Sequence, residues 1–201
     1  MSDILDSVKK KLEGKNPEYI CLGVTDDGSK RISISIPWER TVTAMNMKLP
    51  NVYLSVEEIM NPEVIRYLSE NTRVISCYTF VPLENYEFLA AFPEIIDLEI
   101  RYGINIKSLS FMKNMKSWNM LYLQDAHLKD LKDIFPENGG KRFGLCLALL
   151  VCEVEDISAL TDSNYNLSEL IIFRGKAQSG EQNRWKKVRS STYRYYTLDK
   201  E

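Results

Sequence analysis

Pairs of apolar residues separated by one position recur along the middle of the chain at nearly constant intervals. The pairs begin at Ile75, Leu98, Leu121, Leu147 and Leu170, so the successive steps are 23, 23, 26 and 23 residues. The second members of the pairs are Cys77, Ile100, Leu123, Leu149 and Ile172. All ten positions are apolar in a chain that is 44% apolar, so composition alone does not account for the pattern. A period in the twenties is typical of a solenoid in which each repeat supplies one short strand and a return segment.

Further apolar residues follow the pairs at matching offsets, which predicts a regular return segment. In the third unit they are Ala126, Leu128, Leu131, Ile134 and Phe135. In the fourth unit they are Cys152, Val154, Ile157 and Leu160. The step of 26 residues coincides with a turn-rich insertion at 136–141. Segments 108–115 and 129–135 have helix-like apolar spacing, so we expect a parallel sheet covered on one side by helices and turns.

The layout of these units resembles the leucine-rich repeat family. The third unit reads Leu-x-Leu-x-x-Ala-x-Leu-x-x-Leu from Leu121, and the fourth reads Leu-x-Leu-x-x-Cys-x-Val-x-x-Ile from Leu147. The resemblance covers residues 74–175, with a fainter unit at Val52 and Leu54, and at the family's sixth position, usually Asn or Cys, only Cys152 fits. The resemblance implies an α/β solenoid with its sheet on one face and helices or turns on the other. Proteins similar to this family often bind or inhibit other proteins, so it also allows an inhibitor or immunity-type role.

The patterns divide the chain into an N-terminal cap at 1–50, the solenoid at 51–175 and a C-terminal capping tail at 176–201. Residues 2–13 carry an apolar stripe at helical spacing and predict a short amphipathic helix. Residues 19–24 and 31–36 have strand patterns on either side of the turn Asp-Asp-Gly-Ser, which predicts a β-hairpin. Asn61 followed by Pro62 predicts the start of a further helix.

Composition narrows the classes of function. With 26 Lys and Arg against 28 Asp and Glu, the net charge is −2, so no overall charge calls for a nucleic acid or an acidic membrane. The four cysteines form no C-x-x-C pair, and we expect buried thiols rather than disulfides or metal ligands. No signal peptide or membrane-spanning stretch is evident, so we expect a cytoplasmic protein without a membrane partner.

The residues between the inward columns of each strand are the candidate binding site. Tyrosine and arginine commonly anchor protein interfaces, so we expect a protein partner to bind the exposed strand face. The candidate partner-binding residues are Tyr78, Glu99, Arg101, Tyr102, Tyr122, Gln124, Asp125, Phe173 and Arg174. The alternative interpretation is that they are ordinary neighbours on a half-solvated sheet. An apolar patch at Ala148, Leu150 and Val151 is either a docking point or covered by the C-terminal tail, and we favour the tail.

Two other classes of function have less support. Segment 184–196 interleaves five basic residues with Trp185 and three tyrosines, so an RNA-associated protein acting through this tail is the alternative function. The single histidine, His127, follows a predicted strand and is more typical of a surface residue than of a general base. No catalytic motif, phosphate loop or metal-ligand pattern appears, so we expect a non-enzymatic protein without catalytic residues, cofactor or metal.

Overall fold

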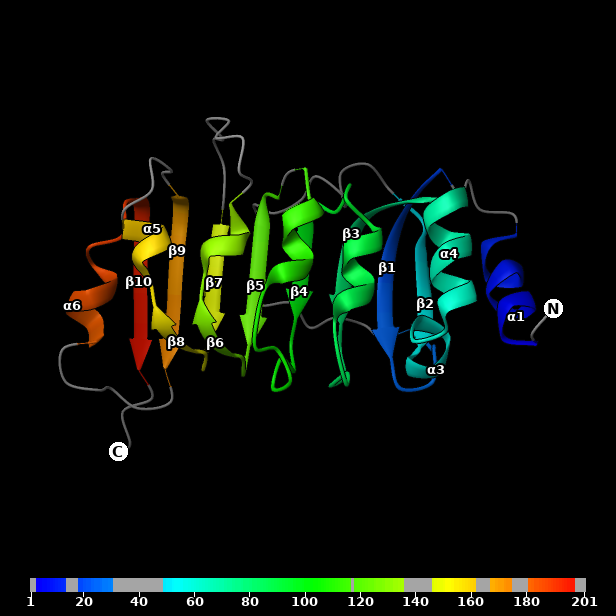
Figure 1. The fold of residues 1–201 in the computed structure, drawn as a ribbon, viewed down its shortest axis with the longest axis horizontal. Helices are drawn as coiled ribbons and strands as arrows, with labels where there is room; N and C mark the ends of the chain where they lie inside the picture. The colour runs from blue at the N-terminus through cyan, green and yellow to red at the C-terminus, as the bar shows by residue number, and fades with distance from the viewer. Residues whose placement is uncertain are drawn as a thin grey trace.

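The computed structural model describes residues 3–13, 18–30, 49–116, 118–135, 146–161, 167–174 and 181–197. Among these residues an open eight-stranded sheet runs the length of the molecule (Figure 1). Its strands are β1 (Tyr19–Thr25), β2 (Asn51–Ser55), β3 (Arg73–Thr79), β4 (Asp97–Ile100), β5 (Met120–Gln124), β7 (Cys146–Leu150), β9 (Leu167–Arg174) and β10 (Ser190–Thr197). Their spatial order is β10-β9-β7-β5-β4-β3-β1-β2, and each neighbouring pair is parallel. The predicted α/β class with a parallel sheet is confirmed.

Helices and a second, smaller sheet lie along one face of the main sheet (Figure 1). The α-helices are α1 (Asp3–Leu12), α3 (Val56–Ile59), α4 (Pro62–Asn71), α5 (Ser158–Thr161) and α6 (Glu181–Trp185). The 3-10 helices are η1 (Glu87–Ala91), η2 (Ser110–Asn114) and η3 (Lys132–Ile134). The second sheet pairs β6 (His127–Asp130) with β8 (Glu153–Asp156) in parallel. Segment 129–135, predicted to be helical, is therefore the end of a strand followed by a short 3-10 turn.

The register of the strands follows the apolar repeat. Leu98 pairs with Leu121, Leu121 with Leu147, and Leu147 with Leu170. These columns and the return segments form one core, in which Leu98, Leu121, Leu147 and Leu170 are fully buried. At an apolar transfer energy of about 1.5–3 kcal/mol per buried side chain, before the opposing chain entropy, the core is the main source of stability.

The first unit is shifted by two residues from the predicted alignment. Cys77, not Ile75, pairs with Leu98. Strand β3 also has a one-residue irregularity against β1, where Ile20 pairs with Val74 while the next residue, Cys21, pairs with Ser76. The inserted residue, Ile75, has no partner on β1, and the insertion reverses the face that the preceding residues of β3 occupy. Cys77 lies fully buried in the core as predicted, whereas the inserted residue does not join it.

The N-terminal region is interleaved with the rest of the sheet. Strand β1 lies between β2 and β3, so its two edges are occupied by parallel neighbours. The predicted hairpin is therefore wrong for β1, and its second arm, 31–36, lies outside the described residues. Two predicted helices are confirmed: α1 buries Leu5, Val8 and Leu12, and the side chain of Asn61 caps α4 by accepting a hydrogen bond from the Glu63 N–H.

The C-terminal tail extends the sheet instead of covering the apolar patch. Tyr193 of β10 pairs with Leu170, which continues the step of 23 residues by one more strand. The rings of Tyr193 and Tyr195 pack against the core, and Trp185 of α6 is fully buried there. The expectation that the tail lies over Ala148 and Leu150 is therefore wrong for residues 190–197.

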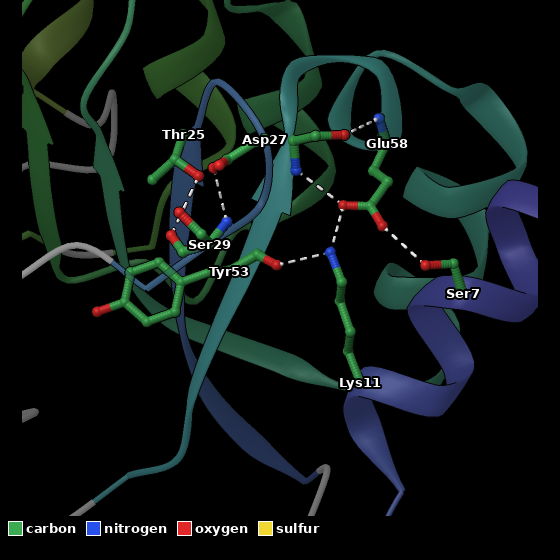
Figure 2. Close-up of polar contacts among 8 residues, drawn as sticks. Ser7, Lys11, Thr25, Asp27, Ser29, Tyr53 and Glu58 are labelled. Atoms are coloured by element: carbon green, nitrogen blue, oxygen red, sulfur yellow. Dashed lines mark hydrogen bonds and ion pairs between the residues drawn. The ribbon is translucent and has the colours of Figure 1, made fainter.

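A polar network joins α1 to the edge of the sheet (Figure 2). The Lys11 ammonium lies 2.6 Å from Oε2 of Glu58 and donates to the Tyr53 carbonyl oxygen at 3.1 Å. The same Glu58 oxygen accepts from the Ser55 N–H at 2.7 Å, and the Ser7 hydroxyl donates to its Oε1 at 3.2 Å. Ser55 and Glu58 together form a capping box at the start of α3. One carboxylate therefore ties together α1, β2 and α3.

We expect Leu121→Ala to lower the free energy of unfolding by about 2–5 kcal/mol, because it leaves a cavity in the middle of the apolar column. The measurement is urea unfolding followed by circular dichroism. Leu150→Ala is the matched control, since Leu150 is only partly buried and lies on the opposite face of the sheet. An equal loss in the two variants would contradict the assignment of the core.

We expect Glu58→Gln to lower stability by about 2 kcal/mol at neutral pH, with the difference vanishing in acid. Burial alone raises the pKa of Glu58, but Lys11, the Ser55 N–H and Ser7 together hold it below its usual value. A lowered carboxyl pKa adds stability above the unfolded-state pKa, and this stability is lost as the pH falls through the folded-state pKa. Thermal melts at several pH values measure the difference, and a difference that persists at pH 2 would contradict it.

Candidate functional site

The candidate site is the face of the main sheet opposite the helices, which we call the open face. No described helix or strand packs against it (Figure 1). Alternate residues of each strand point to this face because successive side chains of a strand point to opposite sides. The strand register lines these residues up in rows that cross the sheet.

The middle row holds three of the predicted site residues and is called the tyrosine row. It runs in register through Tyr53, Gly23, Tyr78, Glu99, Tyr122, Ala148, Ile171 and Arg194. The ring of Tyr53 lies across Gly23, where a Cβ atom would be only 2.6 Å from a ring carbon. A glycine at this place allows the aromatic ring to lie flat on the sheet. Three predicted site residues, Tyr78, Glu99 and Tyr122, are thus direct neighbours.

Short polar contacts extend the tyrosine row toward the ends of the strands. Nε of Arg101 lies 2.6 Å from Oε1 of Glu99, and its guanidinium is 5.4 Å from the centre of the Phe80 ring. The Tyr122 hydroxyl donates to Oε1 of Gln124 at 3.3 Å, and Nε2 of Gln124 donates to Asp125 at 3.1 Å. Burial, followed by the carboxylate of Glu99, raises the pKa of Tyr122 to about 12, so the phenol stays neutral.

The half of the open face nearer the C-terminus is apolar. Tyr122, Cys146, Ala148 and Ile171 form a buried cluster of their own, with Leu150 packed against it. Beside them the rings of Phe173 and Tyr196 lie 6.4 Å apart, and Tyr196 is 46% exposed. The open face therefore joins a polar half, rich in tyrosine and carboxylate, to an apolar half.

Three predicted site residues lie outside this arrangement because they follow the strand or fall on its other side. Tyr102 follows β4 and is 44% exposed, and its carbonyl oxygen accepts a hydrogen bond from the Tyr86 hydroxyl. Asp125 adopts a left-handed turn, with a φ of 60°, directly after β5. Arg174 has the same parity as the core residue Ile172 and is only 8% exposed, so its prediction for the open face is wrong.

The sequence interpretation missed Asp97, the first residue of β4. Asp97 lies on the open face between Ser76 and Met120 and is 1% exposed. Neither of its carboxylate oxygens has a hydrogen-bond partner among the described residues. Burial raises the pKa of Asp97 to about 7. One signal in the sequence could have found Asp97. The residue directly before an apolar pair belongs to the same strand, and its side chain points to the open face.

The residues considered for catalysis and for RNA binding lie away from the tyrosine row. His127 is exposed on β6, where Nδ1 lies 2.9 Å from Glu153 and Nε2 lies 3.5 Å from Glu155. Two residues of the basic, aromatic tail serve the fold, because Trp185 is fully buried and the Arg184 guanidinium donates to backbone carbonyl oxygens of β8.

The four cysteines are all buried, free thiols. The described residues contain no group of three or more side chains arranged to hold a metal ion. Within the same residues, none of the helices has the length and apolar character needed to cross a bilayer. Comparison with family models, with curated proteins and with solved structures found no match to this chain.

Between pH 5 and pH 8 we expect the free energy of unfolding of the wild-type chain to fall by about 3 kcal/mol more than that of Asp97→Asn. A raised carboxyl pKa means that the unfolded chain releases the proton first, so stability falls as the pH rises toward the folded-state pKa of about 7. Chemical unfolding at the two pH values measures the change. Asp125→Asn, at a partly exposed carboxyl, is the control, and a parallel pH dependence of wild type and Asp97→Asn would contradict the assignment.

Proposed function

We propose that this chain is a non-enzymatic module that binds another protein through the open face. The observation that carries the proposal is the continuity of the tyrosine row with the apolar half, on a face that no described helix or strand covers. Aromatic side chains anchor interfaces because they bury a large area and lose little conformational freedom on binding. A hydrogen-bonded sheet holds these anchors in fixed positions before the partner arrives.

The dimensions of the open face support this proposal. The tyrosine row crosses eight strands, which at about 4.8 Å per strand gives a length of about 34 Å. Three alternate residues along a strand add about 13 Å of width, so the footprint of the face is several hundred Å². This is of the order of one side of a standard protein interface, about 800 Å². A protein surface therefore fits the face better than a small molecule does.

The more specific parts of the proposal concern architecture and role. We infer a cytoplasmic solenoid of leucine-rich-repeat type, supported by the recurring register step and by four thiols that are free. An inhibitor or immunity-type protein is the role that suits a rigid face with one partner. The RNA-associated alternative gains no support from Arg184 and Trp185, which contact the chain's own backbone and core.

We expect the double variant Tyr78→Ala/Phe173→Ala to lose capture of the protein partner while it keeps its fold. Both side chains are only partly buried, and they lie in the polar and apolar halves of the open face. The measurement is pull-down from lysate of the native cell with the full chain as bait, followed by mass spectrometry. Circular dichroism and the melting temperature report on the fold.

The matched control is Tyr67→Ala, which removes a partly buried ring from α4 on the other side of the sheet. The proposal expects Tyr67→Ala to capture the same partner as the wild-type chain. Unchanged capture by the folded double variant, or loss of capture by Tyr67→Ala alone, would contradict binding through the open face.

A further inference from the structure

A hollow of about 530 Å³ lies on the helix-covered face, between α3, α4 and the 3-10 helix η1. Figure 1 shows α3 and α4 side by side near the end of the sheet that carries β2. Of the apolar residues that line the hollow, Ile59 and Phe88 are buried, whereas Met60, Ile65 and Ala91 are partly exposed. An apolar hollow of this volume that opens to solvent is typical of a binding site.

The charge at this hollow is positive. Arg66 of α4 and Asn85, which precedes η1, are exposed residues on its wall, and none of the described residues that line it is an aspartate or a glutamate. The Arg66 guanidinium forms no ion pair with a described residue, although Glu70 lies one turn away on the same helix. Oδ1 of Asn85 accepts from the Glu87 N–H, so the amide group of Asn85 retains its N–H donors. The hollow therefore suits an apolar group with a carboxylate beside it.

A second hollow, of about 410 Å³, adjoins the first and shares Ser69 and Ala91 with it. It is polar, because Glu94 and Lys116 form an ion pair on its wall and Arg73 also lines it. The two hollows follow α4, which has ten residues and is about 15 Å long. An extended chain covers this length with about five residues. A peptide fits both hollows better than an acyl chain does, since an acyl chain has no polar groups to place in the second one.

We propose that these two hollows, which together we call the α4 groove, bind an extended peptide segment of a partner protein in which an apolar residue stands next to an acidic one. The apolar side chain lies in the first hollow against Ile65 and Phe88. The neighbouring carboxylate accepts charge-assisted hydrogen bonds from the Arg66 guanidinium, and the polar main chain continues into the second hollow. The α4 groove lies on the opposite side of the sheet from the open face, so this interaction goes beyond the proposed function and is independent of it.

The probe is a capped hexapeptide of alternating leucine and glutamate, in which an acidic residue has an apolar neighbour in either chain direction. It is titrated into the full chain while NMR follows the backbone amide groups of α4 and η1. We expect these resonances to shift. Two control peptides replace every glutamate by glutamine or every leucine by alanine, and each should bind about fivefold more weakly, because it lacks one half of the contact. Octanoate is the control for a carboxylate on an acyl chain.

Two variants test the two halves of the contact. Arg66→Gln should weaken binding of the leucine-glutamate peptide about fivefold and leave binding of the leucine-glutamine peptide unchanged. Its matched control is Arg189→Gln, at an exposed arginine near the other end of the sheet. Ala91→Leu narrows both hollows and should weaken binding by a similar factor, whereas Ala90→Leu, at the neighbouring partly exposed residue of η1, should bind as the wild-type chain does. Melting temperatures report on the fold of each variant.

Three results would overturn the inference. The first is unchanged binding of the leucine-glutamate peptide by folded Arg66→Gln or by folded Ala91→Leu. The second is a set of shifted resonances confined to residues outside α4 and η1. The third is octanoate binding in the α4 groove as tightly as the peptide, which would show a site for an acyl chain instead. Since Tyr78→Ala/Phe173→Ala tests the open face alone, failure of this inference and failure of the proposed function are told apart.

Discussion

The structure depends on the register between parallel strands that places one apolar residue beside the next across the sheet. Leu98, Leu121, Leu147 and Leu170 lie in one such column, and all are fully buried. No single strand with its return segment buries enough apolar surface to be stable alone, so each unit depends on its neighbours. The same register decides which side chains point to the open face, because moving a strand by one residue would exchange its two faces.

The two faces of the sheet therefore serve different purposes. The helix-covered face supplies the core, and α1, β10 and Trp185 extend that core at the two ends of the sheet. The open face contains groups that contribute little to folding or oppose it, and Asp97 is the clearest of them. Asp97 has no hydrogen-bond partner among the described residues, and an unpartnered buried carboxyl group costs stability.

Much of the central fold could be predicted from the apolar repeat, because columns that lie in a core must be apolar at a fixed spacing. The shift at Ile75 could not, since an inserted residue leaves the same local pattern of apolar and polar residues. The position of β1 between β2 and β3 depends on long-range pairing, for which a short β-patterned segment gives no signal. Of the site, Tyr78, Glu99 and Tyr122 followed from strand alternation, whereas Asp97 required the true start of β4.

The most direct test of the register is a measurement of short proton distances across the strands by NMR. The account predicts nuclear Overhauser effects between backbone protons around Leu98 and Leu121, and around Leu121 and Leu147, in the order expected of parallel strands. Effects in an antiparallel order, or pairings displaced by one residue, would place the tyrosine row on the wrong face and contradict the account.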